Sequence, residues 1–228
     1  MVSSTSESSL ATSLCNLSAR VALLLAMLAC SHRSVSAQTP APRPTRDEAA
    51  IVSVAKFVGG AAVGLVLHES GHLVFDVAFD AGAGTKKVSY AGIPFLAVTH
   101  HPVSPVREFA ISSAGFWVQH ATSELLLTRR PNLRQDHAPL LKGVLAFNVL
   151  ASVVYTGAAF ARTGPLERDT RGMALSARVD EPWIGGVILV PAALDAVRYF
   201  RPESRALRWA SRVAKIGGVL LVIKAASL

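Results

Sequence analysis

Two histidines and a glutamate carry the clearest chemistry in this sequence. They are His68, Glu69 and His72, in the run His-Glu-Ser-Gly-His. Residues four apart in a helix project from the same face, so both imidazoles can reach one metal ion. A glutamate beside such a site can take a proton from an attacking water. The spacing therefore predicts a metal site held by His68 and His72, with Glu69 as the catalytic base of a hydrolysis.

The setting of this motif is apolar. The stretch from Phe57 to Leu67, directly before it, contains no ionisable side chain. Ionisable groups are costly in a membrane helix and are therefore candidates for function. We expect a metal site inside a membrane or at its edge. A structural cluster of His and Glu, hydrogen-bonded inside a helix bundle, is the alternative.

A catalytic zinc needs a third protein ligand and an open position. Both cysteines, Cys15 and Cys30, lie in the N-terminal segment, so the third ligand must be His, Asp or Glu. Asp195 is the best candidate because it is a lone acid in an apolar run. The alternative is an ion pair with Arg198 or Lys56. Rival ligands are Glu108, Glu124 and His120.

Other polar residues are candidates for supporting roles. Asp76 follows His72 by one turn and could orient its ring, or it could be an interfacial acid at a helix end. An oxyanion could be stabilised by one of three further histidines, each of which could equally be a packed or interfacial residue. These are His100, His101 and His120.

Composition and segment lengths indicate the elements that must position these groups. Charged residues make up 17% of the chain, against about 25% in average soluble domains. The predicted fold is an all-α, polytopic membrane bundle with a short membrane-associated β-hairpin at about 88–100. Gly60 and Gly64 should let a neighbouring helix approach the first helix closely. The five predicted transmembrane helices cover about 48–79, 105–128, 138–161, 182–200 and 206–226.

The N-terminal part has the pattern of a targeting segment. Residues 1–37 combine a charged start, a short apolar core and a small-x-small exit, which predicts a signal peptide, with an uncleaved anchor or a lipoprotein-like site at Cys30 as alternatives. Residues 38–47 form a Pro-rich linker, and residues 48–228 form the membrane domain. The net charge of +8 is spread over segment ends, which fits contacts with lipid headgroups and argues against nucleic-acid binding. We expect a multi-pass protein of the cell (inner) membrane.

The two motifs resemble those of a known family. His68-Glu-Ser-Gly-His72, followed far downstream by Pro191-Ala-Ala-Leu-Asp195, is similar to the site-2 protease family of intramembrane zinc metalloproteases. The resemblance implies that His68, His72 and Asp195 bind Zn²⁺ and that Glu69 is the catalytic base. It also implies a membrane-embedded hairpin, and a small-residue stretch on the intervening helix, which residues 112–115 resemble.

The resemblance predicts a zinc endopeptidase acting on membrane-protein or peptide substrates. Ala196 stands where the family has Gly after its Asp. Two other interpretations therefore remain: a non-proteolytic protein that binds or transports metal along His68, His72, Asp76 and Asp195, and a pseudoprotease that serves as a binding scaffold.

Overall fold

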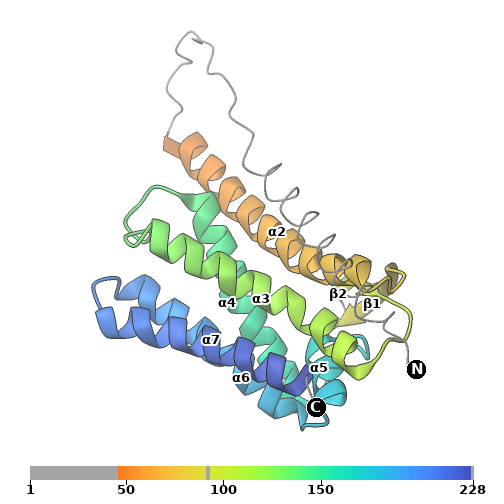
Figure 1. The fold of residues 1–228 in the computed structure, drawn as a ribbon. Coiled ribbons are helices and arrows are strands. Elements are labelled where there is room, and N and C mark those ends of the chain that lie inside the picture. The colour runs from red at the N-terminus through yellow and green to blue at the C-terminus, as the bar shows by residue number, and fades with distance from the viewer. Residues whose placement is uncertain (1–45, 91–92, 227–228) are drawn as a thin grey trace, which may run out of the picture. The chain divides into compact units, whose positions relative to one another are not determined.

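The computed structural model describes residues 46–90 and 93–226. Residues 45–228 belong to one compact unit, in which six helices and a two-stranded antiparallel sheet are described (Figure 1). In chain order the elements are α2 (Arg46–Ala78), β1 (Gly84–Tyr90), β2 (Ile93–Thr99), α3 (Pro105–Arg129), α4 (Pro139–Ala161), α5 (Asp169–Ala177), α6 (Glu181–Phe200) and α7 (Arg205–Ala226).

The five predicted helices are confirmed in position, and the predicted hairpin is present but begins at Gly84 rather than at about residue 88. α2 begins at Arg46, so the last two residues of the predicted linker 38–47 belong to it. The predicted signal peptide, 1–37, lies outside the described residues. The additional element is α5, which lies in the stretch 162–181 that the sequence predicted to be a loop.

Fewer helices are long and apolar enough to cross a membrane than the five predicted. Within the described part of the chain there are three such segments, Ala49–Ala78, Pro139–Ala161 and Glu181–Phe200. α3 is less apolar because five of its buried side chains are polar, namely Ser112, Ser113, Gln119, His120 and Ser123. α7 contains several basic residues, of which Lys215 is buried. The prediction of five spans is therefore corrected to three candidate spans.

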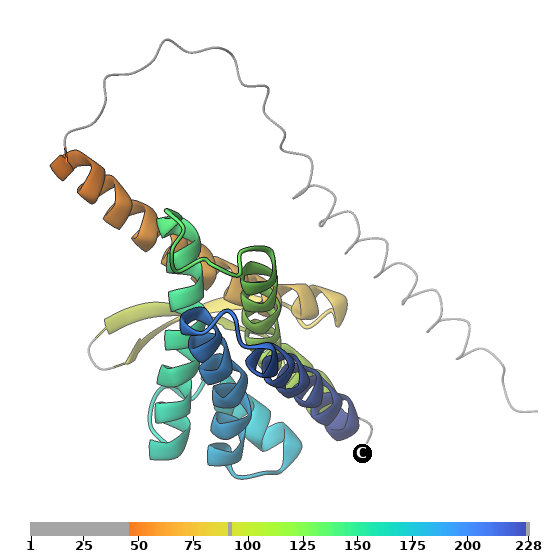
Figure 2. The same cartoon turned by 90° about the vertical axis from the view of Figure 1, so that its left-hand side faces the viewer.

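Glycines let α2 and α4 pack backbone to backbone, with α2 crossing α4 obliquely (Figure 2). A Cβ at Gly60 would collide with the carbonyl of Leu140, and one at Gly143 with the carbonyl of Phe57. Further along α2, a Cβ at Gly71 would lie 2.8 Å from the Ala114 carbonyl oxygen of α3. The predicted close approach at Gly60 is confirmed. Gly71, inside the histidine motif, allows a similar close approach of α3.

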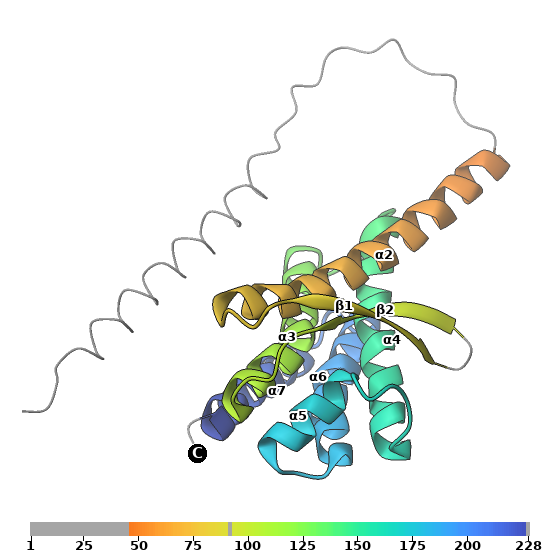
Figure 3. The same cartoon turned by 90° about the vertical axis from the view of Figure 1, so that its right-hand side faces the viewer.

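The hairpin and α5 form the surroundings of the histidine motif. The hairpin pairs Gly84 with Thr99 at its open end, β2 contacts α2, and in the view of Figure 3 the hairpin lies between α2 and α5. α5 packs on α3 and α6 through a buried apolar cluster. That cluster comprises Phe109, Phe116, Met173, Ala174, Ile184 and Ile188.

Candidate metal centre

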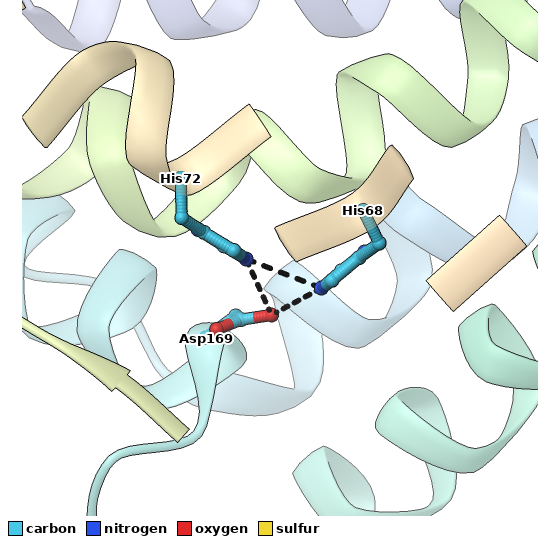
Figure 4. A group of neighbouring side chains, drawn as sticks. All are labelled: His68, His72 and Asp169. Carbon is cyan, nitrogen blue, oxygen red and sulfur yellow. Dashed lines mark hydrogen bonds and ion pairs between the residues drawn. The ribbon is translucent and has the colours of Figure 1, made fainter. Parts of the chain in front are cut away.

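Three potential ligand atoms converge at the junction of α2 and α5. His68 and His72 lie one turn apart on α2, and Asp169 is the first residue of α5 (Figure 4). Asp169 Oδ2 lies 3.0 Å from His68 Nε2 and 3.5 Å from His72 Nε2. The two Nε2 atoms are 3.2 Å apart. This group can hold a metal ion.

The three distances fit a zinc site. Four ligands placed tetrahedrally at about 2.0–2.1 Å from a zinc ion are separated from one another by about 3.3 Å. The observed separations, 3.0, 3.2 and 3.5 Å, surround that value. Two imidazoles and one carboxylate also match a ligand set known for catalytic zinc. The residues present therefore suit zinc with little rearrangement.

His72 is held in the orientation that a ligand needs. Its Nδ1 donates a hydrogen bond to the carbonyl oxygen of Ile111 on α3, at 2.8 Å. This bond fixes the ring so that Nε2 faces Asp169, and a metal ion bound there would take the lone pair of Nε2. The predicted orienting role of Asp76 is thus taken by a backbone carbonyl. Among the described residues, neither carboxylate oxygen of Asp76 has a hydrogen-bond partner.

Packing positions the second imidazole. His68 stacks on Tyr155 with ring centroids 5.9 Å apart, and it meets the ring of Phe116 edge-on at 5.4 Å. Gly115 of α3 faces this ring: an added Cβ would lie 2.6 Å from both of its nitrogens. The small-residue stretch 112–115 thus provides the space in which His68 sits.

Replacing Gly115 by alanine should displace His68 and weaken any metal binding at this group by about tenfold or more, the size of effect expected when the support of a ligand is disturbed. A competition titration with a zinc chelator on the purified protein measures the change. Gly59→Ala is the matched control, because a Cβ there meets no atom within 4 Å. Equal zinc affinity in the two variants would show that α3 does not fix this ligand.

The electrostatics of Asp169 favour an ionised ligand. Burial alone would raise the pKa of Asp169, but the facing imidazoles of His72 and His68 hold its pKa below the usual range. Its place at the N-terminus of α5 adds the favourable end of the helix dipole. A metal ligand must be deprotonated, and this carboxyl group meets that requirement.

Glu69 faces the same space as the ligands. It lines a cavity of about 580 Å³ together with His68, His72 and Asp169. The walls are mainly apolar and come from α2, the end of β2, α3, α4, the loop 164–168 and the start of α5. Lys86 of β1 binds Glu167 of that loop at 2.6 Å, and this bond lowers the pKa of Glu167. The candidate metal ligands therefore lie on the wall of a mainly apolar cavity, and the hairpin and the loop 164–168 border this cavity.

Asp195, the predicted third ligand, lies outside the group formed by the histidines and Asp169. Its Oδ1 accepts hydrogen bonds from Ser211 and Lys215 of α7, both at 2.7 Å. The carboxylate thus neutralises a buried lysine between α6 and α7. The structure replaces Asp195 by Asp169 as the carboxylate beside the two imidazoles.

The rival ligands have other partners. Glu124 binds Arg198, Arg212 and Lys215 at 2.6–2.9 Å. Glu108 accepts a hydrogen bond from Ser112 and lies 3.4 Å from His100. His120 is buried on α3, where its ring meets that of Trp117.

The histidines considered for an oxyanion differ in their positions. His100 lines the cavity, so this role stays a prediction for it. His101 is exposed near the turn at Gly82.

Sequence reasoning missed Asp169. This residue follows Arg168 in a stretch with charges of both signs, where an acid has no unusual neighbourhood. The available signal was weak: an acid directly after a Pro-containing turn is a helix N-terminus pattern. This helix-start pattern predicts α5, but it does not predict that Asp169 lies beside the histidines of α2.

The resemblance to site-2 proteases rests on two motifs. The structure brings the histidines of the first motif together with Asp169 and leaves Asp195, from the second motif, outside that group. Comparisons with protein-family models, with curated proteins and with solved structures found no match to this chain.

Proposed function

We propose that this protein is a membrane-embedded zinc metalloprotease that hydrolyses peptide bonds of membrane-associated substrates. His68, His72 and Asp169 would hold the zinc. The observation that carries the proposal is the convergence of these three ligand atoms beside Glu69, on the wall of an apolar cavity. Three protein ligands leave a tetrahedral ion one open position, as in catalytic zinc sites.

In the proposed hydrolysis, the zinc ion would act as the Lewis acid and Glu69 as the general base. Bound zinc would supply a Lewis acid that polarises a carbonyl and lowers the pKa of water towards about 7. Glu69 follows His68 directly on α2 and lines the same cavity, so it can accept the proton of the attacking water. It would then pass this proton to the leaving nitrogen. Tyr155, stacked on His68, restricts the movement of that ligand.

The hairpin supports the choice of an extended peptide as substrate. Ala97, Val98 and Thr99 of β2 line the cavity. In the described sheet of two strands, each strand has one edge that does not face the other strand. An extended peptide can add to such an edge through main-chain hydrogen bonds. The apolar walls of the cavity suit the apolar side chains of a membrane segment.

The outer surface of the helices supports a membrane location. Ala49–Ala78 has a mean hydropathy of 2.1 and is mostly not buried inside the protein. Its exposed side chains include Val54, Val58, Val63 and Val66. Exposed apolar faces of this kind are stable against lipid chains. We therefore propose a multi-pass protein of the cell (inner) membrane whose partner is the lipid bilayer.

The metal-transport alternative has less support from the arrangement. It required Asp76 and Asp195 to continue a path from the two histidines. Asp195 is instead bound to Lys215, a cation that would repel a metal ion passing by. A pseudoprotease scaffold would have the same metal site but no cleavage activity, so the activity of the wild type in the experiment below separates it.

A Glu69→Gln variant should keep one zinc per chain and lose about 10²–10⁴-fold in cleavage rate, because the general base is removed and the ligands are not. Zinc content is measured on the purified full chain, and cleavage on a membrane-segment substrate in detergent or liposomes. Ser70→Ala is a matched control on the same turn, since Ser70 bonds only to the Val66 carbonyl among the described residues. Undiminished cleavage by the Glu69 variant would rule out this mechanism, and an inactive wild type that binds zinc would favour the scaffold.

A further inference from the structure

The two residues that flank Asp169 in the sequence both bind the buried carboxylate of Glu181. Arg168 donates to Glu181 of α6 through two parallel bonds, Nε to Oε1 at 2.7 Å and Nη2 to Oε2 at 2.6 Å. Thr170 donates its hydroxyl to the same Glu181 Oε1 at 2.7 Å. The residues before and after Asp169 are therefore bound to one carboxylate.

This group is buried. The side chains of Arg168 and Glu181 are 8% and 9% exposed, and Thr170 is fully buried. Arg168 also donates from Nη1 to the carbonyl oxygen of Pro165, at 3.0 Å, which holds the loop before α5. A bidentate arginine–carboxylate pair in such surroundings constrains both distance and angle. We call Arg168, Thr170 and Glu181 the clamp.

The metal centre needs such a constraint because its ligands come from separate elements. The spacing of His68 and His72 is set within α2, but Asp169 lies 101 residues beyond His68 and must be placed by tertiary contacts. Metal–ligand distances tolerate only about 0.2 Å of error. Apolar packing of α5 on α3 and α6 positions the helix, whereas the clamp fixes its first residues against the start of α6.

We infer that the clamp is a positioning device that sets the Asp169 carboxylate against the two imidazoles. This inference rests on the metal site of the proposed function, and it does not depend on hydrolysis. Arg168, Thr170 and Glu181 act through Asp169 and touch neither the metal nor the substrate. Their loss should therefore weaken metal binding while leaving the helical fold in place.

The experiment measures zinc affinity and stability separately on the full chain purified in detergent. Glu181→Gln removes the charge and one acceptor of the bidentate pair, and Thr170→Val removes one hydroxyl at nearly constant volume. We expect zinc affinity to fall by about 10- to 100-fold in Glu181→Gln, and by less in Thr170→Val. Thr170→Ser, which keeps the hydroxyl, should restore wild-type affinity.

The control is a neighbouring ion pair that does not flank the ligand. Arg162 and Asp180 pair at the surface, with both side chains more than half exposed. Asp180→Asn should leave zinc affinity unchanged. The melting temperature of the zinc-free protein and its far-ultraviolet circular dichroism show whether each variant is folded. If Glu181→Gln does not fold, Thr170→Val and Thr170→Ser still decide the question.

The outcomes are distinct. A loss of affinity in folded Thr170→Val that Thr170→Ser restores supports the clamp. Clamp variants that melt at a lower temperature but bind zinc like the wild type overturn it and leave the proposed function intact. A wild-type protein that binds no zinc overturns both proposals. Zinc binding with clamp-dependent affinity but no cleavage removes the protease function alone.

Discussion

Replacing Asp169 by alanine is expected to lower zinc affinity by at least about 100-fold, whereas Asp195→Asn keeps one zinc per chain. The first change removes one of the three converging ligand atoms and the only charged one. The second changes a carboxylate that is bound to Ser211 and Lys215. Zinc content after dialysis and the zinc dissociation constant from chelator competition give the measurement.

Stability measurements complete this comparison. Asp195→Asn should lower the melting temperature, because Lys215 loses one of its two acidic partners in a buried position. Asp169→Ala should change the melting temperature of the zinc-free protein less. The opposite pattern of zinc binding, lost with Asp195 and kept without Asp169, would return the third-ligand role to Asp195.

The Glu124→Ala variant should be destabilised by about 3 kcal/mol, the lower end of the range for breaking a buried ion pair. Glu124 receives hydrogen bonds from Arg198, Arg212 and Lys215. Arg198 is 2% exposed, so its charge would be left in a buried site with a hydroxyl of Thr128 as its remaining partner among the described residues. Reversible unfolding in mixed detergent micelles measures the free energy.

An exposed pair provides the comparison for this variant. Arg130 and Asp136 lie 3.6 Å apart, and Arg130 is 60% exposed. Asp136→Ala should cost less than about 1 kcal/mol, as is usual for surface pairs. Similar losses in the two variants would mean that the network around Glu124 has no special role in holding α3, α6 and α7 together.

Local patterns of the chain were sufficient to predict five of the six described helices and two of the three groups of the candidate metal centre. The spacing of His68 and His72 is a property of one helix, and long apolar segments reveal their own boundaries. The number of spans was overestimated because α3 buries several polar side chains and α7 carries basic residues that bind Glu124 and Asp195. Which face of a helix is buried follows from tertiary packing.

The third group of the candidate metal centre, Asp169, depends on contacts between distant segments. Asp195 stood out as a lone acid, since its partner Lys215 comes from the next helix, 20 residues later. Asp169 did not stand out, because α5 is a nine-residue helix that needs packing against α3 and α6 to form. Sequence spacing carries no information on which charged loop residue reaches α2.

The division of the ligand set between α2 and α5 has a consequence for folding. A metal that joins His68 to Asp169 closes a chain loop of 101 residues, so it acts as a cross-link as well as a cofactor. Zinc would bind the native chain far better than the unfolded one, in which these ligands are far apart. Each tenfold rise in free zinc above the dissociation constant then adds about 1.4 kcal/mol to the stability of the folded state. If the proposed centre holds zinc, the abundance of the folded protein would be coupled to the zinc supply of its compartment.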